Sequence, residues 1–300
     1  MSRELKIVIP DEALTVGDIV GRAVRITRLN WLPLLKFFLI PTFINDFAST
    51  IMTWEPETID PSVSPSVTYW IVIASFVVLF WTTWELGIRR FALLVFIADG
   101  TIGLEEALQF ARRRMWLILV LSIPVVIAEI CTGGFFLLFQ MVVNAMPHTD
   151  LPEPIHVYIT FFMLFLILVL MLPTLSVWII NTFFLSIVAF ESTNIKSTIA
   201  RFFRLVFPTF RAFFSYTTLM ACAYVAVFFP TIITATFSFF LPHSIASSIV
   251  EYTLASIFET PIYSFLTAAI TIGGACFYKQ MRAKLEGQDI LDKLKVLNAS

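Results

Sequence analysis

The residue of this sequence that most suggests chemistry is a single carboxylate inside an apolar run. Glu129 lies in the segment LILVLSIPVVIAEI, residues 117–130. Counted from Met115, it lies roughly 21 Å along a helix, which is close to the midplane of a bilayer. A carboxylate at that depth is costly and by default indicates a function. We expect Glu129 either to be protonated and hydrogen-bonded, for example to Asn181, or to line a polar cavity that handles a proton or a substrate.

The other polar residues favour structural roles over catalysis. Glu85 precedes Arg89 by one helical turn, so we expect an ion pair at the cytoplasmic membrane boundary. The histidines, the acids near them and the cysteines follow no metal-ligand or CxxC spacing, and we expect the cysteines to be small buried side chains. These residues are His148, His156, His243, Asp150, Glu153, Glu251, Cys131, Cys222 and Cys276. Because no nucleophile–base pair, nucleotide loop or redox pair is present, we expect neither an enzyme nor a bound metal or cofactor.

Three stretches combine an apolar face with a row of cations: residues 15–30, 102–116 and 194–207. Their three- and four-residue apolar spacing predicts amphipathic helices in the membrane interface. Thr15 with Asp18 resembles a capping box, and Asn194 is a good N-cap. We name their arginines the cationic collar: Arg22, Arg25, Arg28, Arg112, Arg113, Arg114, Arg201 and Arg204. Near an anionic leaflet each adds roughly 1 kcal/mol of attraction. The collar is expected either to bind lipid headgroups or a partner, or only to set the topology.

The elements that position these residues are transmembrane helices. Hydrophobic residues make up 58% of the chain and charged residues only 14%, which predicts an all-α, polytopic membrane protein. The first residues are polar and mixed, so no cleavable signal peptide is expected. Loops or amphipathic stretches separate six apolar runs: about 31–54, 67–98, 115–143, 155–190, the stretch before Leu241, and 245–278.

The amphipathic stretches recur at an interval of roughly 90 residues. Each one precedes a transmembrane hairpin, which divides a single membrane domain (1–300) into units at about 14–98, 101–190 and 193–279, with a tail at 280–300. Threefold internal duplication and convergent patterning of membrane hairpins both account for this period.

The distribution of charge predicts the orientation. All 20 Lys and Arg fall in the N-terminal region up to Lys36, in 89–114, in 196–211, or from Lys279 onward. The loops 55–66, 144–154 and 242–244 contain none of them, and the first two carry acids instead: Glu55, Glu57, Asp60, Asp150 and Glu153. By the positive-inside rule, both termini and all three amphipathic helices are expected to be cytoplasmic.

The C-terminal sequence PIYSFLTAAITIGGACFYKQMRAKLEGQDILDKL resembles the end of a bacterial six-helix membrane family. That family includes the membrane domain attached to some glycerophosphoryl diester phosphodiesterases and related stand-alone inner-membrane proteins. The resemblance rests on Tyr278, Arg282, Glu286, Gly287 and Asp289, and extends in degenerate form to the stretches beginning near residues 14 and 102. It implies the fold and a bacterial inner-membrane location, and it brings no catalytic residue with it.

These observations together predict a non-enzymatic integral inner-membrane protein. It would act as a scaffold, accessory subunit or membrane-homeostasis factor that contacts anionic lipid or a membrane protein complex, with no nucleic-acid partner. The alternative is a transporter or lipid-handling protein in which Glu129, with Asn181 and Glu85 as further polar residues, forms an intramembrane site.

Overall fold

A computed structural model describes residues 7, 15–52, 65–128, 131, 162, 175–191, 194–238 and 245–299. Over these residues the protein is helical and contains no strand. The helices are α1 (Val16–Leu29), α2 (Trp31–Met52), α4 (Pro65–Asp99), α5 (Leu104–Arg113), α8 (Ile195–Val206), α9 (Phe210–Ser238) and α10 (Ile245–Ala299), with helices at Met115–Ala128 and Leu175–Glu191. The predicted all-α class is therefore confirmed.

Three described segments are long and apolar enough to cross a membrane: Trp31–Ser49, Tyr69–Asp99 and Ser256–Gly287. A fourth is obtained if Leu175–Glu191 and Ile195–Ala226, which meet at 112°, are counted as one broken span. Several of the expected spans lie partly outside the described residues. The number of six spans and the threefold repeat therefore stay predictions.

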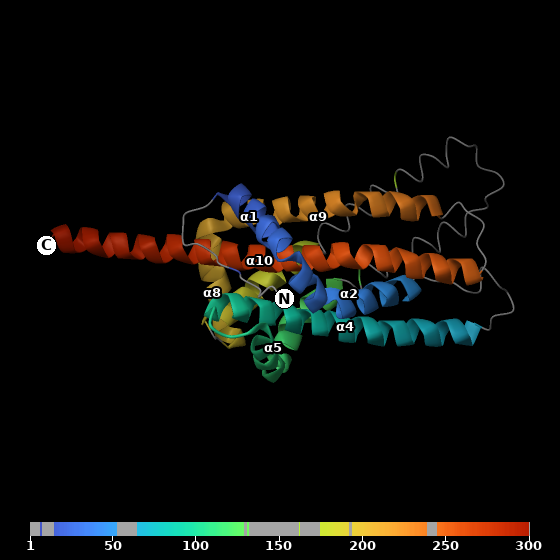
Figure 1. Ribbon diagram of the computed structural model, residues 1–300. Coiled ribbons are helices and arrows are strands. Elements are labelled where there is room, and N and C mark those ends of the chain that lie inside the picture. The colour runs from blue at the N-terminus through green and yellow to red at the C-terminus, as the bar shows by residue number, and fades with distance from the viewer. Residues whose placement is uncertain are drawn as a thin grey trace.

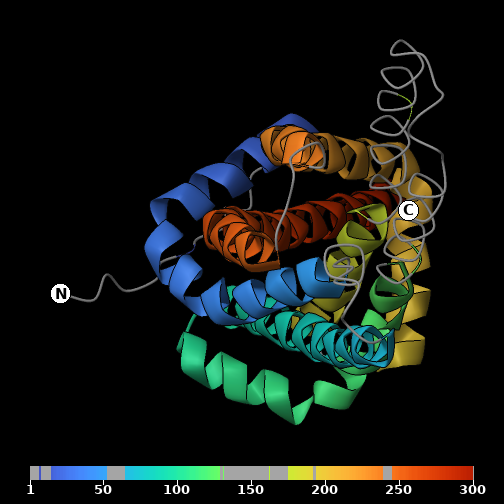
Figure 2. The same cartoon turned by 90° about the vertical axis from the view of Figure 1, so that its right-hand side faces the viewer.

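Helix α10 is the central element of the bundle. Figure 2 shows it surrounded by α1, α2, α4 and α9, all of which contact it. In an apolar 18-residue stretch of its membrane-length segment 78% of the residues are buried, against 28% in the corresponding stretch of α2 and 33% in that of α4. Figure 1 shows α10 continuing past the other helices at one end, which we call the collar end of the bundle. The expected charged tail from residue 280 is thus a continuation of this helix.

Two glycines allow α10 to pack closely against its neighbours. A Cβ atom on Gly273 would lie 2.8 Å from the Tyr216 hydroxyl oxygen, and one on Gly274 would lie 2.7 Å from Cγ2 of Thr182. Both distances are far below an ordinary carbon contact. The absence of a side chain at these two positions therefore permits the close helix contact.

Each short amphipathic helix begins with a cap of its own. The Thr15 hydroxyl accepts a hydrogen bond from the Asp18 amide at 3.2 Å, and the Asp18 carboxylate accepts one from the Thr15 amide at 3.1 Å. The Asn194 side chain accepts from the Ser197 amide at 2.9 Å. Both predicted caps are confirmed. In the middle helix the Glu106 carboxylate accepts from the Gly103 amide at 3.3 Å.

Protein covers part of the apolar faces of α1 and α5, so these faces need not be covered by lipid alone. Ile19 and Ala23 are buried in α1, which packs on α10, and Ala107 and Ala111 are buried in α5, which packs on α4. Helical periodicity cannot distinguish these two environments, because both are apolar. Large exposed aromatic residues lie instead where the next helix begins: Trp31, Trp116 and Phe210. Amphipathic aromatic rings such as Trp favour the membrane–water interface.

The three cysteines are free thiols in different surroundings. Cys276 is buried, as expected, whereas Cys131 and Cys222 are exposed. The prediction of burial is wrong for these two because their small apolar side chains lie on outward helix faces.

Candidate functional site

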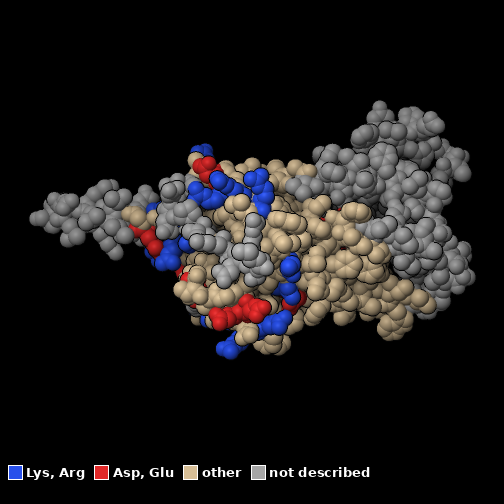
Figure 3. Space-filling view, in the orientation of Figure 1, with Lys and Arg blue, Asp and Glu red and all other residues tan. Residues whose placement is uncertain are grey.

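The described charges gather toward the collar end of the molecule. On the face seen in Figure 3, Lys, Arg, Asp and Glu lie over the half nearer that end, and the adjoining described surface is almost free of charge. Arg25, Arg28, Arg112, Arg113 and Arg204 are exposed, whereas Arg22, Arg114 and Arg201 are half-buried. The structure thus brings the collar arginines to one end of the bundle, on three different helices.

The predicted ion pair between Glu85 and Arg89 is confirmed, with Nε of Arg89 3.0 Å from the Glu85 carboxylate. Arg112 also approaches that carboxylate, at 3.6 Å. Glu85 therefore joins α5 to α4 as well as stabilising α4 itself. Arg89 also donates to the carbonyl oxygen of Phe37 in α2, so this group of charges positions three helices.

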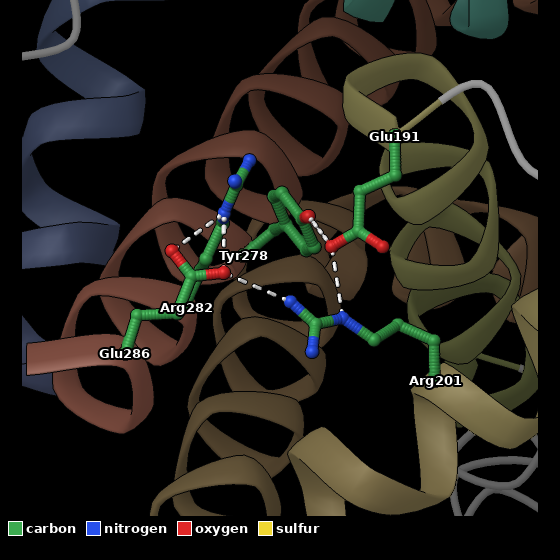
Figure 4. A network of polar contacts seen from close by, with 5 residues as sticks. All are labelled: Glu191, Arg201, Tyr278, Arg282 and Glu286. Carbon is green, nitrogen blue, oxygen red and sulfur yellow. Dashed lines mark hydrogen bonds and ion pairs between the residues drawn. The ribbon is translucent and has the colours of Figure 1, made fainter. Parts of the chain in front are cut away.

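A second network joins α8 and α10 to the end of helix Leu175–Glu191 (Figure 4). Nε of Arg201 lies 2.9 Å from the Glu191 carboxylate, and one terminal nitrogen lies 3.1 Å from that of Glu286. The Tyr278 hydroxyl donates to Glu191, and Nε of Arg282 lies 2.9 Å from Glu286. Arg201, which belongs to the collar, is thus held between two carboxylates.

This network also gives a physical reason for the C-terminal motif. Tyr278, Arg282 and Glu286 recur every four residues and so lie on one face of α10. Arg201 of α8 meets this face, and Phe183, Phe277 and Tyr278 form an aromatic cluster beside it, with ring centroids 5.8 to 6.0 Å from that of Phe183. The motif therefore fixes the position of α8 against the centre of the bundle.

A buried arginine that the sequence analysis did not single out lies next to Asn181. Arg90 is 2% exposed and donates to the Trp178 carbonyl oxygen at 3.0 Å and to the Thr182 hydroxyl. Its guanidinium carbon lies 4.6 Å from the ring centroid of Trp178. Nδ2 of Asn181 donates to the Leu121 carbonyl oxygen at 2.6 Å. Asn181, predicted as a partner for Glu129, thus bonds to the helix that precedes Glu129.

Helical spacing in α4 could have revealed this burial. Leu86, Arg90 and Leu94 recur every four residues, and all three are buried. Arg90 was not interpreted separately, because the adjacent Arg89 was expected to form an ion pair at a charged membrane boundary.

The intramembrane acids that the structure describes differ from the one that the sequence emphasised. Glu129 lies outside the described residues, as do His148, His156 and His243. Asp46 of α2 is 8% exposed, and it lies near enough to Glu259 of α10 for their charges to interact. Asp46 could have been found by the rule applied to Glu129, because it too interrupts an apolar run. No group of three metal-ligating side chains occurs among the described residues.

Two hollows adjoin the collar. The first, about 570 Å³, lies between α4, α5 and the end of helix Leu175–Glu191. Its charged lining residues are two acids, Asp99 and Glu106, and one base, Arg113. The second, about 610 Å³, lies between the end of α5, the helix that follows it and the start of α8. Its charged lining residues are all cations: Arg113, Arg114 and Lys196. The second hollow is therefore the one suited to an anion.

Comparison with known families, curated proteins and solved structures finds no match to this chain. The resemblance to the six-helix bacterial family consequently stays a prediction.

Proposed function

We propose that this protein is a non-enzymatic, multi-pass protein of the bacterial inner membrane, with both termini cytoplasmic. Its collar would bind anionic phospholipid, and the protein would act as a scaffold, accessory subunit or membrane-homeostasis factor. The observation that carries this proposal is the exposure of Arg25, Arg28, Arg113 and Arg204 at one end of the bundle.

The energy available to the exposed collar is substantial. Arg25, Arg28, Arg113 and Arg204 form no ion pair with another described residue, so their charge is available to the lipid surface. At roughly 1 kcal/mol for each cation near an anionic leaflet, these four side chains would contribute about 4 kcal/mol. Because this attraction is electrostatic, added salt weakens it. At 0.1 M salt, charges separated by more than the Debye length of about 10 Å are largely screened from each other.

The proposal is tested by thermal unfolding of the purified protein in mild detergent, with phosphatidylglycerol or phosphatidylcholine added. Phosphatidylglycerol should raise the melting temperature more, and the variant Arg25→Gln/Arg28→Gln should reduce that difference. The control Glu105→Gln removes an exposed acid from α5 and should leave the difference intact or enlarge it. Equal stabilisation of the wild type by the two lipids would refute lipid binding by the collar.

A second candidate function, transport of a proton or small solute, is favoured by the position of Asp46 and Glu259 on adjacent transmembrane helices. Intramembrane carboxylates commonly mark ion or proton pathways. Proteoliposomes would distinguish the candidates, because a transporter carries a solute or proton flux that Asp46→Asn or Glu129→Gln abolishes. A scaffold would carry no such flux, and Glu129→Gln would leave it intact.

A further inference from the structure

The hollow between α5 and α8 has three features that together describe a ligand. We propose that it is a site for the phosphodiester headgroup of an anionic phospholipid. This inference rests on the proposed function, but adds a defined place and ligand to the general attraction of the collar. We name the hollow lined by Arg113, Arg114 and Lys196 the headgroup site.

The first feature is its charge. Three cations from two separate segments line the headgroup site, and no acid is among its lining residues. The neighbouring hollow shares Arg113 but also includes Asp99 and Glu106, which would repel an anion. The guanidinium carbon of Arg114 lies 4.7 Å from the ring centroid of Phe110. That contact restrains a long side chain and so lowers the entropy cost of binding.

The second feature is the start of α8. Asn194 and Ile195 line the headgroup site at the N-terminus of this 12-residue helix. The first amides of a helix have no carbonyl partner within it, and they carry the positive end of the helix dipole. The Asn194 side chain caps the Ser197 amide. The start of the helix thus adds to the attraction that the three cations exert on a phosphate.

The third feature is an apolar wall, which distinguishes a lipid from a soluble phosphate. Trp116 and Leu117 line the same hollow, and Trp116 is 66% exposed. Its ring lies 6.4 Å from that of Trp84, whose indole nitrogen donates to the Met115 carbonyl oxygen at 3.3 Å. An exposed tryptophan where a membrane helix begins is suited to the glycerol and upper acyl region of a lipid. A phosphate at the cations would therefore lie beside a surface for its lipid chains.

The start of an apolar helix beside this site would bring the site to the depth of lipid headgroups. α5 and α8 lie toward the collar end (Figure 1), and α5 is followed after one residue by the apolar helix Met115–Ala128. A lipid bound here would contact two of the three amphipathic helices at once. Binding would thus stabilise the arrangement of α5 and α8.

Native mass spectrometry of the delipidated full-length protein, titrated with phosphatidylglycerol, tests the proposal. The pocket variant Arg114→Gln/Lys196→Gln and the control Arg25→Gln/Arg28→Gln each remove two charges. The pocket variant should weaken the tightest phosphatidylglycerol binding event roughly 10- to 30-fold, at about 1 kcal/mol for each cation lost. The control should retain that event and lose only weaker binding. Circular dichroism and size-exclusion chromatography establish that both variants are folded.

Each other outcome overturns a defined part of this account. If both variants weaken binding equally while the wild type still prefers phosphatidylglycerol over phosphatidylcholine, the collar acts without a discrete site and only the present inference fails. If the wild type shows no preference between the two lipids, the proposed function fails as well. If inorganic phosphate or glycerol 3-phosphate displaces phosphatidylglycerol at equal concentration, the ligand is a soluble phosphate compound and the assignment to lipid is wrong.

Discussion

Replacing Gly274 with alanine should destabilise the protein, although alanine is the better helix former. The new Cβ would lie 2.7 Å from Cγ2 of Thr182, about 1 Å closer than a favourable carbon contact. Thr182 is fully buried, and its hydroxyl donates to the Trp178 carbonyl oxygen at 2.9 Å and accepts from Arg90. Its methyl group therefore cannot rotate away without breaking these bonds, and β-branched side chains are stiff in any case.

The size of the effect follows from two opposing contributions. Overpacking of a well-packed core costs about 1–3 kcal/mol, and the restrained Thr182 places this site near the upper limit. Helix propensity returns up to about 1 kcal/mol on changing glycine to alanine. We expect a net loss of about 2 kcal/mol.

The assay is equilibrium unfolding in mixed micelles of mild detergent and dodecyl sulfate, followed by circular dichroism. Gly287→Ala is a matched control on the same helix, because a Cβ there meets no atom within 4 Å. It should stabilise the protein by about 0.5–1 kcal/mol through propensity alone. If Gly274→Ala is as stable as the wild type or more stable, the close approach of α10 to helix Leu175–Glu191 is wrong.

Three further predictions concern polar contacts. Glu191→Gln should reduce the free energy of unfolding by about 1–3 kcal/mol. Glu286→Gln changes a more exposed carboxylate and should reduce it by less than about 1 kcal/mol. Equal reductions in the two variants would contradict the network. Arg90→Lys keeps the charge but loses the planar fork of donors, so the same assay should show the free energy of unfolding reduced by at least about 2 kcal/mol. A variant as stable as the wild type would contradict a stabilising role for the hydrogen bonds of Arg90. The Thr15 hydroxyl and amide hold the pKa of Asp18 below its usual range. The cap therefore stabilises α1 at a pH above the usual pKa of an aspartate, and this stabilisation is lost as the pH falls through the lowered pKa. Thr15→Val should raise the pKa of Asp18 in an NMR titration, and an unchanged pKa would contradict the cap.

Local signals in the sequence predicted much of the collar end correctly. The caps at Thr15 and Asn194 and the ion pair of Glu85 with Arg89 all depend on residues within about one turn of a helix. Interactions of that kind are set by spacing alone, so they can be read from the chain.

Contacts between distant segments could not be predicted in the same way. Arg201 belonged to a row of apparently equivalent cations, yet it is held by Glu191 and Glu286, the second of which lies 85 positions away. Arg90 was not distinguished from the adjacent Arg89, yet it is buried against helix Leu175–Glu191. The headgroup site combines the end of α5 with the start of α8, and no periodicity shows that these two segments meet.

The central claim, that the collar binds anionic lipid, is tested most directly by electron paramagnetic resonance with spin-labelled lipids. The measured quantity is the association of labelled phosphatidylglycerol with the reconstituted protein, relative to labelled phosphatidylcholine. We predict a ratio well above one that falls as salt is added, and that falls further when Arg25, Arg28, Arg113 and Arg204 are changed to glutamine. A ratio of one at low salt, unchanged by these substitutions, would contradict the account.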